Sequence, residues 1–193
     1  MKTIQEIEKL VVQLHGLDGS ARNKARAAIE KIGKPAVPFL VELLFDPNRY
    51  VRWEACKALG TIKDPLAADA LAKALDDENV EVRWLAAEAL IALGERAIVP
   101  LLHVLEVRFN SIFVRQSANH VLHALKKEGL LDHELLAVLD TLRYMEPRIS
   151  VPVAARKALE SIRKSKGPNA GHLAEGGSKQ EDNNGRSINH ENS

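Results

Sequence analysis

The stretch VRWEACKAL at residues 51–59 is repeated almost unchanged as VRWLAAEAL at residues 82–90. Three further segments share its pattern of small and aliphatic residues: ARNKARAAI from Ala21, VRQSANHVL from Val114 and VPVAARKAL from Val151. Successive copies begin 30, 31, 32 and 37 residues apart. A period of this length is typical of repeat proteins, in which one supersecondary unit stacks on the next. The sequence therefore predicts about five stacked units.

Each copy has the residue spacing of an amphipathic helix. Its fifth residue is alanine and its ninth is Ile or Leu in all five copies. At about 100° per residue, positions 1, 5, 8, 9 and 12 form one apolar stripe, and the small fifth residue lets a facing helix approach closely. Another apolar helix is expected before each copy, at residues 4–14, 36–44, 66–75, 97–105 and 133–142. We expect an all-α fold, a right-handed α-solenoid of about five helix pairs.

The composition agrees with this fold class and narrows the function. Hydrophobic residues make up 46% of the 193 residues but aromatic residues only 4%, which suits helices packed through small side chains. Lys and Arg number 27 against 26 Asp and Glu, so the chain lacks the basic excess typical of nucleic-acid binders. No stretch approaches the ~18 unbroken apolar residues of a membrane span, and the N-terminus has no signal-peptide core. We expect a soluble, cytoplasmic protein.

The chain divides by composition into two parts. Residues 1–165 carry the repeats and form the predicted repeat domain. After Arg163 the sequence is rich in Gly, Ser and Asn, with only isolated apolar residues. Such a segment buries too little apolar surface to offset the entropy of ordering, so residues 166–193 are predicted to be a disordered C-terminal tail. The tail is interpreted either as a tether for a partner or as an inert extension.

The segments between paired helices contain a recurring aspartate. In the two most regular units Asp46 and Asp77 lie six residues before an arginine that follows a valine, Arg52 and Arg83. With this pattern, residues 1–165 resemble HEAT repeats, and especially the short HEAT-like repeats of the phycobilisome lyases. In that family the aspartate and arginine form a ladder of hydrogen bonds along the stack, which the resemblance implies here for these four residues. The pattern is broken in the other units by Gly16, Phe109 and Pro152.

The resemblance places the second helix of each unit on the concave surface of the stack. On the helical wheel, positions 3, 7 and 10 of each copy point away from the buried stripe. Position 3 is tryptophan in two adjacent units, Trp53 and Trp84, and the sequence contains no other tryptophan. Stacked helices lie ~8–10 Å apart, so the two rings are expected side by side. They either form a binding hot spot or cover the seam between units.

The favoured function is a non-catalytic scaffold or adaptor that holds a helix or loop of another protein on its concave face. The two tryptophans would supply most of the buried area. Polar selectivity would come from outward-facing residues of the same helices, which are Lys57, Glu88, Gln116, His120 and His123. Membranes and nucleic acids are not expected as partners.

Metal and cofactor sites are not expected. His120 and His123 lie three residues apart, with Glu88 in the preceding unit, but no HExxH motif accompanies them. The HEAT-like deoxyhypusine hydroxylases bind iron through His-Glu pairs, and the matching positions here read Trp53-Glu54 and Trp84-Leu85. The two histidines are therefore interpreted as solvated surface groups.

Enzymatic activity is not predicted either. The single cysteine, Cys56, falls on the flank of the buried stripe, and the sequence has no nucleophile elbow or phosphate-binding loop. Two alternatives stay open. A lyase-like role, implied by the family resemblance, would use Trp53, Trp84 and Lys57 to line a tetrapyrrole site. A nucleic-acid groove would need the ladder arginines to face outward, whereas their wheel position puts them beside the core.

Overall fold

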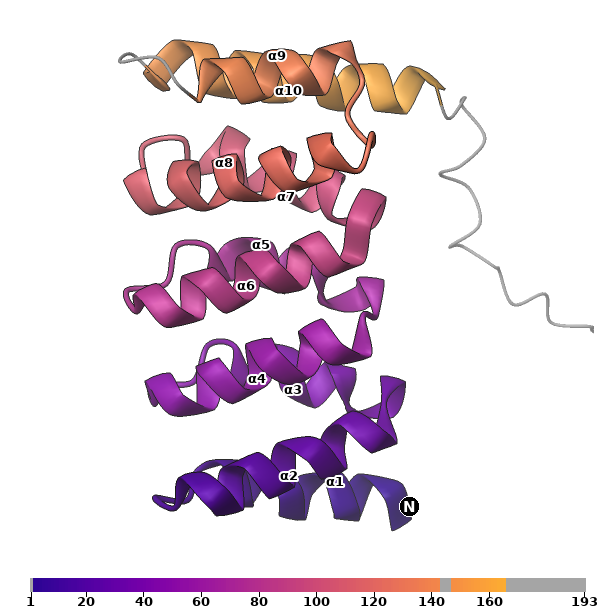
Figure 1. Cartoon of the computed structure of the whole chain (residues 1–193), viewed down its shortest axis with the longest axis vertical. Coiled ribbons are helices and arrows are strands. Elements are labelled where there is room, and N and C mark those ends of the chain that lie inside the picture. The colour runs from indigo at the N-terminus through magenta and orange to yellow at the C-terminus, as the bar shows by residue number, and fades with distance from the viewer. Residues whose placement is uncertain (1, 143–146, 166–193) are drawn as a thin grey trace, which may run out of the picture.

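The computed structural model describes residues 2–142 and 147–165 and arranges them as a stack of helix pairs (Figure 1). The first helices of the pairs are α1 (Lys2–Leu14), α3 (Val37–Leu43), α5 (Ala68–Ala74), α7 (Ile98–Val107) and α9 (His133–Thr141). The second helices are α2 (Gly19–Ile32), α4 (Arg49–Ile62), α6 (Val80–Leu93), α8 (Ile112–Lys127) and α10 (Pro147–Ser165). These two described ranges contain no strand, and the predicted all-α solenoid is confirmed. The predicted disordered tail, residues 166–193, lies outside them.

Each of the first four second helices begins at a side chain that accepts a hydrogen bond from the helix backbone. The capping residues are Asp18, Asn48, Asn79 and Ser111. Caps of this kind satisfy an otherwise unpaired N–H group and stabilise a helix by about 1 kcal/mol. Short 3-10 turns then lead into three of the first helices, at Lys34–Ala36, Pro65–Ala67 and Gly94–Ala97. The polar residues between the paired helices therefore fix where each second helix starts.

Three of the second helices, α2, α4 and α6, end at a residue with a positive φ angle. Gly33 and Gly94 have φ angles of 74° and 60°, as their positions in the sequence indicate. In the unit between them the equivalent residue is Lys63, with a φ of 55°. A side chain in this conformation costs about 1–2 kcal/mol relative to the right-handed helix, so α4 ends at a strained residue.

The core is built from the small and aliphatic residues of the repeat. The alanines at the fifth position of every copy are fully buried: Ala25, Ala55, Ala86, Ala118 and Ala155. At Gly60 of α4, an added Cβ would lie only 3.3 Å from the Cβ of Ala89 in α6. Neighbouring units therefore approach closely because their facing residues are small.

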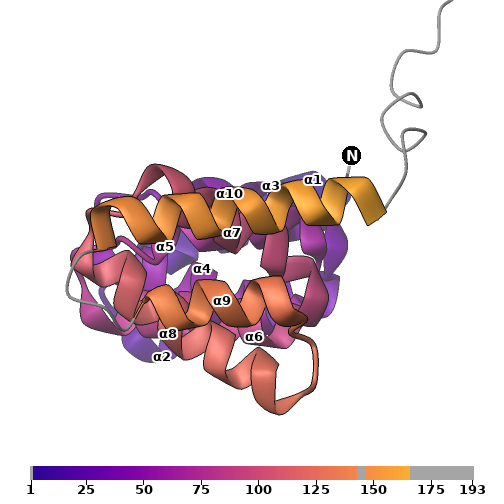
Figure 2. The ribbon, with the colours of Figure 1, turned by 90° about the horizontal axis from the view of Figure 1, so that it is seen from above.

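The fifth pair departs from the regular order of the stack. In the first four units each second helix packs on the next one, α2 on α4, α4 on α6 and α6 on α8. In the last unit α10 packs on α7 and α9, and α9 packs on α8 (Figure 2). Arg156 of α10 donates to Glu106 of α7 at 2.8 Å across this contact. The helix that contains Val151, α10, was predicted to continue the row formed by α2, α4, α6 and α8. It packs instead beside α7, in the row of the first helices, and α9 takes the place next to α8.

Candidate binding face and polar ladder

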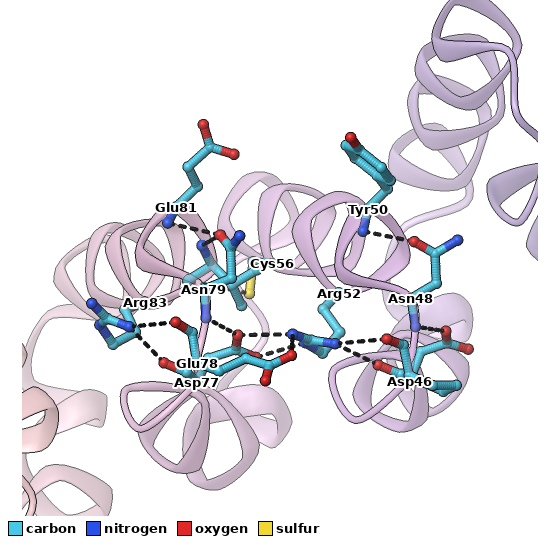
Figure 3. Close-up of polar contacts among 12 residues, drawn as sticks. Asp46, Asn48, Tyr50, Arg52, Cys56, Asp77, Glu78, Asn79, Glu81 and Arg83 are labelled. Atoms are coloured by element: carbon cyan, nitrogen blue, oxygen red, sulfur yellow. Dashed lines mark hydrogen bonds and ion pairs between the residues drawn. The ribbon is translucent and has the colours of Figure 1, made fainter.

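Arg52 joins two consecutive units at the turns between their helices (Figure 3). Its Nη1 donates to the backbone carbonyls of Asp46, at 2.9 Å, and Pro47 in its own unit. Its Nε and Nη2 donate to the two carboxylate oxygens of Asp77 in the next unit, at 2.7 and 3.0 Å. The Asp77 carboxylate raises the pKa of Arg52, which is only 7% exposed. A bidentate, largely buried pair of this kind fixes both distance and orientation.

The hydrogen bonds of the other arginines at this position stay within their own unit. Arg83 donates to the carbonyls of Asp77, at 2.7 Å, and Glu78. Towards the next unit its guanidinium lies 4.0 Å from the ring centroid of Phe113, because no aspartate is available there. Arg22 likewise donates to the carbonyls of Gly16 and Leu17, and Arg115 to that of Phe109. The arginines are therefore held against the turns, and one of them, Arg52, links neighbouring units through a carboxylate.

A histidine takes the place of an arginine beside Asp46. The Nε2 atom of His15 lies 2.8 Å from an Asp46 carboxylate oxygen, and its Nδ1 lies 3.0 Å from the carbonyl oxygen of Val11. Both partners are acceptors, so both contacts are satisfied as hydrogen bonds only by the doubly protonated imidazolium. These hydrogen bonds raise the pKa of His15, the Val11 carbonyl more than the carboxylate. The sequence pattern did not indicate this residue, because no other unit has a histidine there.

A second polar link between units lies on the other side of the helices. Glu54 of α4 is 4% exposed and accepts a hydrogen bond from Arg26 Nε of α2 at 2.8 Å. Arg22 Nε is buried 3.8 Å from the same carboxylate, too far for a hydrogen bond. This pair was not predicted, because a Glu at that position occurs in one copy only. Arg26 and Glu54 thus hold α2 against α4.

The two tryptophans lie on adjacent second helices and differ in exposure. Trp53 is half-buried, and the Nζ atom of Lys57 lies 4.5 Å from its ring centroid. Trp84 is 57% exposed. Both rings line an open pocket of about 430 Å³, together with Lys57, Val80, Glu81 and Leu85. The seam between units is therefore partly covered by Trp53, while Trp84 leaves most of its surface in solvent.

The remaining predicted face residues lie on α6 and α8. Glu88 Oε1 and His120 Nε2 are 2.8 Å apart, so these two side chains pair across the units. Gln116 is exposed, whereas His123 is half-buried. These residues therefore extend the face beyond the tryptophans, but the pocket between Trp53 and Trp84 does not include them.

Several kinds of site have no counterpart in the described part of the chain. No three His, Cys, Asp or Glu side chains gather there in a way that could hold a metal ion. Cys56 is buried, and this burial raises the pKa of its thiol, which disfavours the reactive thiolate. Within the same ranges, no helix is long and apolar enough to cross a membrane.

Exposed apolar residues beside the tryptophans were missed by the sequence analysis. They lie at the N-terminal ends of α4, α6 and α8 and are Tyr50, Val80, Ile112 and Phe113. They precede the first position of each repeated segment, so they lie outside the repeated pattern. The signal was present, because Val80 and Trp84 are four residues apart and share one face of α6.

A further pocket, of about 560 Å³, lies on the first helices around α5. Its lining includes Phe45, Lys73, His103, Val107 and Arg108. The helix α5 is seven residues long, whereas α7 extends to ten, a difference that no periodic pattern predicts.

Comparison with known proteins agrees with this architecture. Residues 7–91 match the family described as HEAT repeats, and residues 82–106 match the PBS lyase HEAT-like repeat. The fold and the family matches define an α-solenoid of helix-pair repeats. The chain is a HEAT-like repeat solenoid, similar to HEAT repeats over residues 7–91 and to the repeats of the phycobilisome lyases over residues 82–106. No curated protein sequence matches it.

Among solved structures, the fold is similar to a chain in the complex of CpcE and CpcF of phycocyanin lyase from Nostoc sp. PCC7120. The TM-score is 0.55 at 23% sequence identity, and the match covers 81% of this chain and 99% of that one. A designed armadillo repeat protein matches with a TM-score of 0.37 at 18% identity, over 80% of this chain and 99% of that one. At these identities the likeness to solved structures concerns the fold.

Proposed function

We propose that this chain is a non-catalytic scaffold or adaptor that binds another protein on the face of its second helices. The observation that carries the proposal is the pocket between Trp53 and Trp84, with Trp84 more than half exposed. A large aromatic ring left in water gains free energy when a partner covers it, and tryptophan is enriched at binding hot spots. Lys57, Glu88, Gln116, His120 and His123 would give the surrounding contacts their selectivity. Residues 166–193 are proposed to be a tail outside this binding domain.

A double variant, Trp53→Ala with Trp84→Ala, tests the proposal. Tagged wild-type and variant chains are compared for the proteins they retain from the native cell extract, and circular dichroism checks that both are folded. We expect the variant to lose its specific partner. The matched control is Leu66→Ala, which removes an exposed apolar residue from the 3-10 turn that leads into α5. If the wild type and the double variant retain the same proteins in equal amounts, the proposal is wrong.

A chromophore-handling role is the alternative that one observation favours. The same pocket combines two aromatic rings with the cationic Lys57, which suits a planar tetrapyrrole that carries carboxylates. Titration of the chain with a free bilin, followed by absorbance, distinguishes the two functions. A shift of the bilin absorbance maximum to longer wavelength on binding, absent with the Trp84→Ala variant, would favour this alternative over protein binding.

A nucleic-acid groove is less consistent with the geometry. The ladder arginines donate to carbonyl groups of the turns, so their guanidinium groups are not available to phosphates. We expect no binding to random duplex DNA at moderate salt. Binding with a steep salt dependence would overturn this expectation.

A further inference from the structure

Exposed or half-buried apolar side chains recur at the N-terminal ends of three successive second helices. The strip, as we call it below, consists of Tyr50 and Trp53 on α4, Val80 and Trp84 on α6, and Ile112 and Phe113 on α8. The exposed fractions of Val80, Trp84 and Ile112 are 64%, 57% and 54%. In Figure 3 the side chain of Tyr50 points away from the ladder. The strip therefore faces solvent, at three successive levels of the stack.

We propose that the strip binds an amphipathic α-helix of a partner protein, laid across α4, α6 and α8 along the axis of the stack. This inference rests on the proposed protein-binding function and names the form and chemistry of the occupant. The partner helix contributes one large apolar residue to each level, with an acidic residue beside the first and a basic residue beside the second.

The spacing of the strip sets the periodicity of its occupant. Adjacent packed helices are ~8–10 Å apart, so the three levels span roughly 20 Å. An α-helix rises 1.5 Å per residue, and seven residues of it span roughly 10 Å and return to nearly the same face. A helix with an apolar residue at one position of each heptad therefore meets the three levels in register.

Backbone hydrogen bonding distinguishes a helix from an extended segment. An extended peptide would press its own N–H and C=O groups against the strip. The pocket between the tryptophans offers it two charged side chains, Lys57 and Glu81, and otherwise apolar side chains. Each buried backbone group left unpaired costs about 1–3 kcal/mol, whereas a helix pairs these groups internally. The apolar lining therefore favours a helical occupant.

Exposed charges of opposite sign lie beside the α4 and α6 levels of the strip. Arg49 and Lys57 flank the α4 level, and both are exposed. Glu81, which is exposed and lines the pocket between the tryptophans, flanks the α6 level, whereas Arg83 of α6 donates to the carbonyl of Asp77 and lies over the ring of Phe113. Opposite charges on the partner at these levels would fix its register, because like charges placed together are unfavourable. This order of signs predicts the acidic and basic residues of the partner helix.

The test uses the full chain and a synthetic peptide of about three heptads. The peptide carries leucine at one position of each heptad, glutamate beside the first leucine and lysine beside the second. One control peptide replaces both charged residues by glutamine, and another places proline in the central heptad to break the helix. Affinity is measured by calorimetry, and helix formation in the complex by circular dichroism.

We expect the charged peptide to bind as a helix and the proline peptide to bind at least about tenfold more weakly. Trp84→Ala and Ile112→Ser should each weaken binding about tenfold, because they remove anchors at different levels. Leu66→Ala, at an exposed residue outside the strip, should leave the affinity unchanged. Lys57→Glu should weaken binding of the charged peptide several-fold and leave the glutamine peptide unaffected.

Three results would overturn the inference while the proposed function stands. In the first, the proline peptide binds as tightly as the charged peptide. In the second, Ile112→Ser leaves the affinity for the charged peptide unchanged. In the third, the chain binds no peptide, although capture of a partner from cell extract still depends on the tryptophans. Self-association abolished by Trp84→Ala would also overturn it, since the occupant would then be a second copy of the chain. The proposed function itself fails only if the double tryptophan variant captures partners like the wild type.

Discussion

At the scale of single residues, Arg52 makes the contact that couples adjacent units most directly. Arg52→Ala would leave the Asp77 carboxylate, 8% exposed, without its cation and two carbonyl groups without a donor. Removing one partner of a buried pair costs about 3–5 kcal/mol. We expect a fall of this order in the free energy of unfolding measured with urea.

Arg83→Ala is the matched control for this prediction. Arg83 occupies the same position in its unit but reaches no carboxylate in the next one. Its removal takes away two carbonyl contacts of a charged donor and the contact with the Phe113 ring, and should cost about 2 kcal/mol. Equal losses for the two variants would show that the carboxylate bridge adds nothing to the carbonyl contacts.

His15 predicts a pH-dependent contribution to stability. Its pKa in the folded chain is raised, so its contribution is fully present below the unfolded pKa, about 6.5, and is lost as the pH rises through the folded value. The side chain is 43% exposed, so solvent screening keeps the effect to about 0.5 kcal/mol.

The measurement compares His15→Ala with wild type by urea unfolding at about pH 5.5 and pH 8. The variant should be more destabilised at the lower pH. His103→Ala, at an exposed histidine of α7, serves as the control. A loss for His15→Ala that is the same at both pH values would contradict the protonated pairing with Asp46.

At the scale of helices, the end of α4 offers a stabilising substitution. Lys63 occupies a left-handed conformation that glycine adopts without strain. We expect Lys63→Gly to raise the free energy of unfolding by about 1 kcal/mol, seen as a higher melting temperature. Gly33→Ala, at the equivalent end of α2, should have the opposite effect. A Lys63→Gly chain that melts lower than wild type would refute this explanation.

The period of the repeat predicts which residues of a helix are buried, but it does not predict contacts that occur in a single unit. The fifth-position alanines report burial directly, because facing helices tolerate only small residues there. The exposed residues Val80 and Ile112 precede the first position of the repeat, so the periodicity of the repeat does not include them. The contacts of Glu54 and His15 depend on long side chains in single units. A repeat pattern carries no information about such individual pairs.

At the scale of the whole molecule, each unit is stabilised by its neighbours, and the last unit closes the core. Chains shortened to residue 165 and to residue 142 separate the contributions of the tail and of α10. The first should unfold like the full chain, since the tail is expected to bury little. The second loses the buried Val151 and Leu159, which contribute about 3 kcal/mol or more. The urea midpoint measures both, and a large effect of the tail alone would contradict the proposed domain boundary.

The register of the fifth unit shows where sequence repetition stops predicting the arrangement of units. Its VPVAARKAL segment matches the repeat at the buried positions, and Ala155 is indeed in the core. The match does not specify which row the helix joins, because a buried stripe packs equally well against either row. The longer interval before this copy and Pro152 in place of arginine were the signs of a different arrangement.

The placement of α9 and α10 also affects how copies of the chain meet. A perfectly regular solenoid has a last surface that matches its first one, so identical chains are able to polymerise head to tail into an open filament. Here α10 lies in the row of first helices and α9 in that of second helices, so the C-terminal surface differs from those between earlier units. The N-terminal unit of another copy would find no equivalent of the α8 surface to join. The surface of the α9 and α10 pair is thus a poor match for the head-to-tail contact that a regular solenoid would repeat between copies.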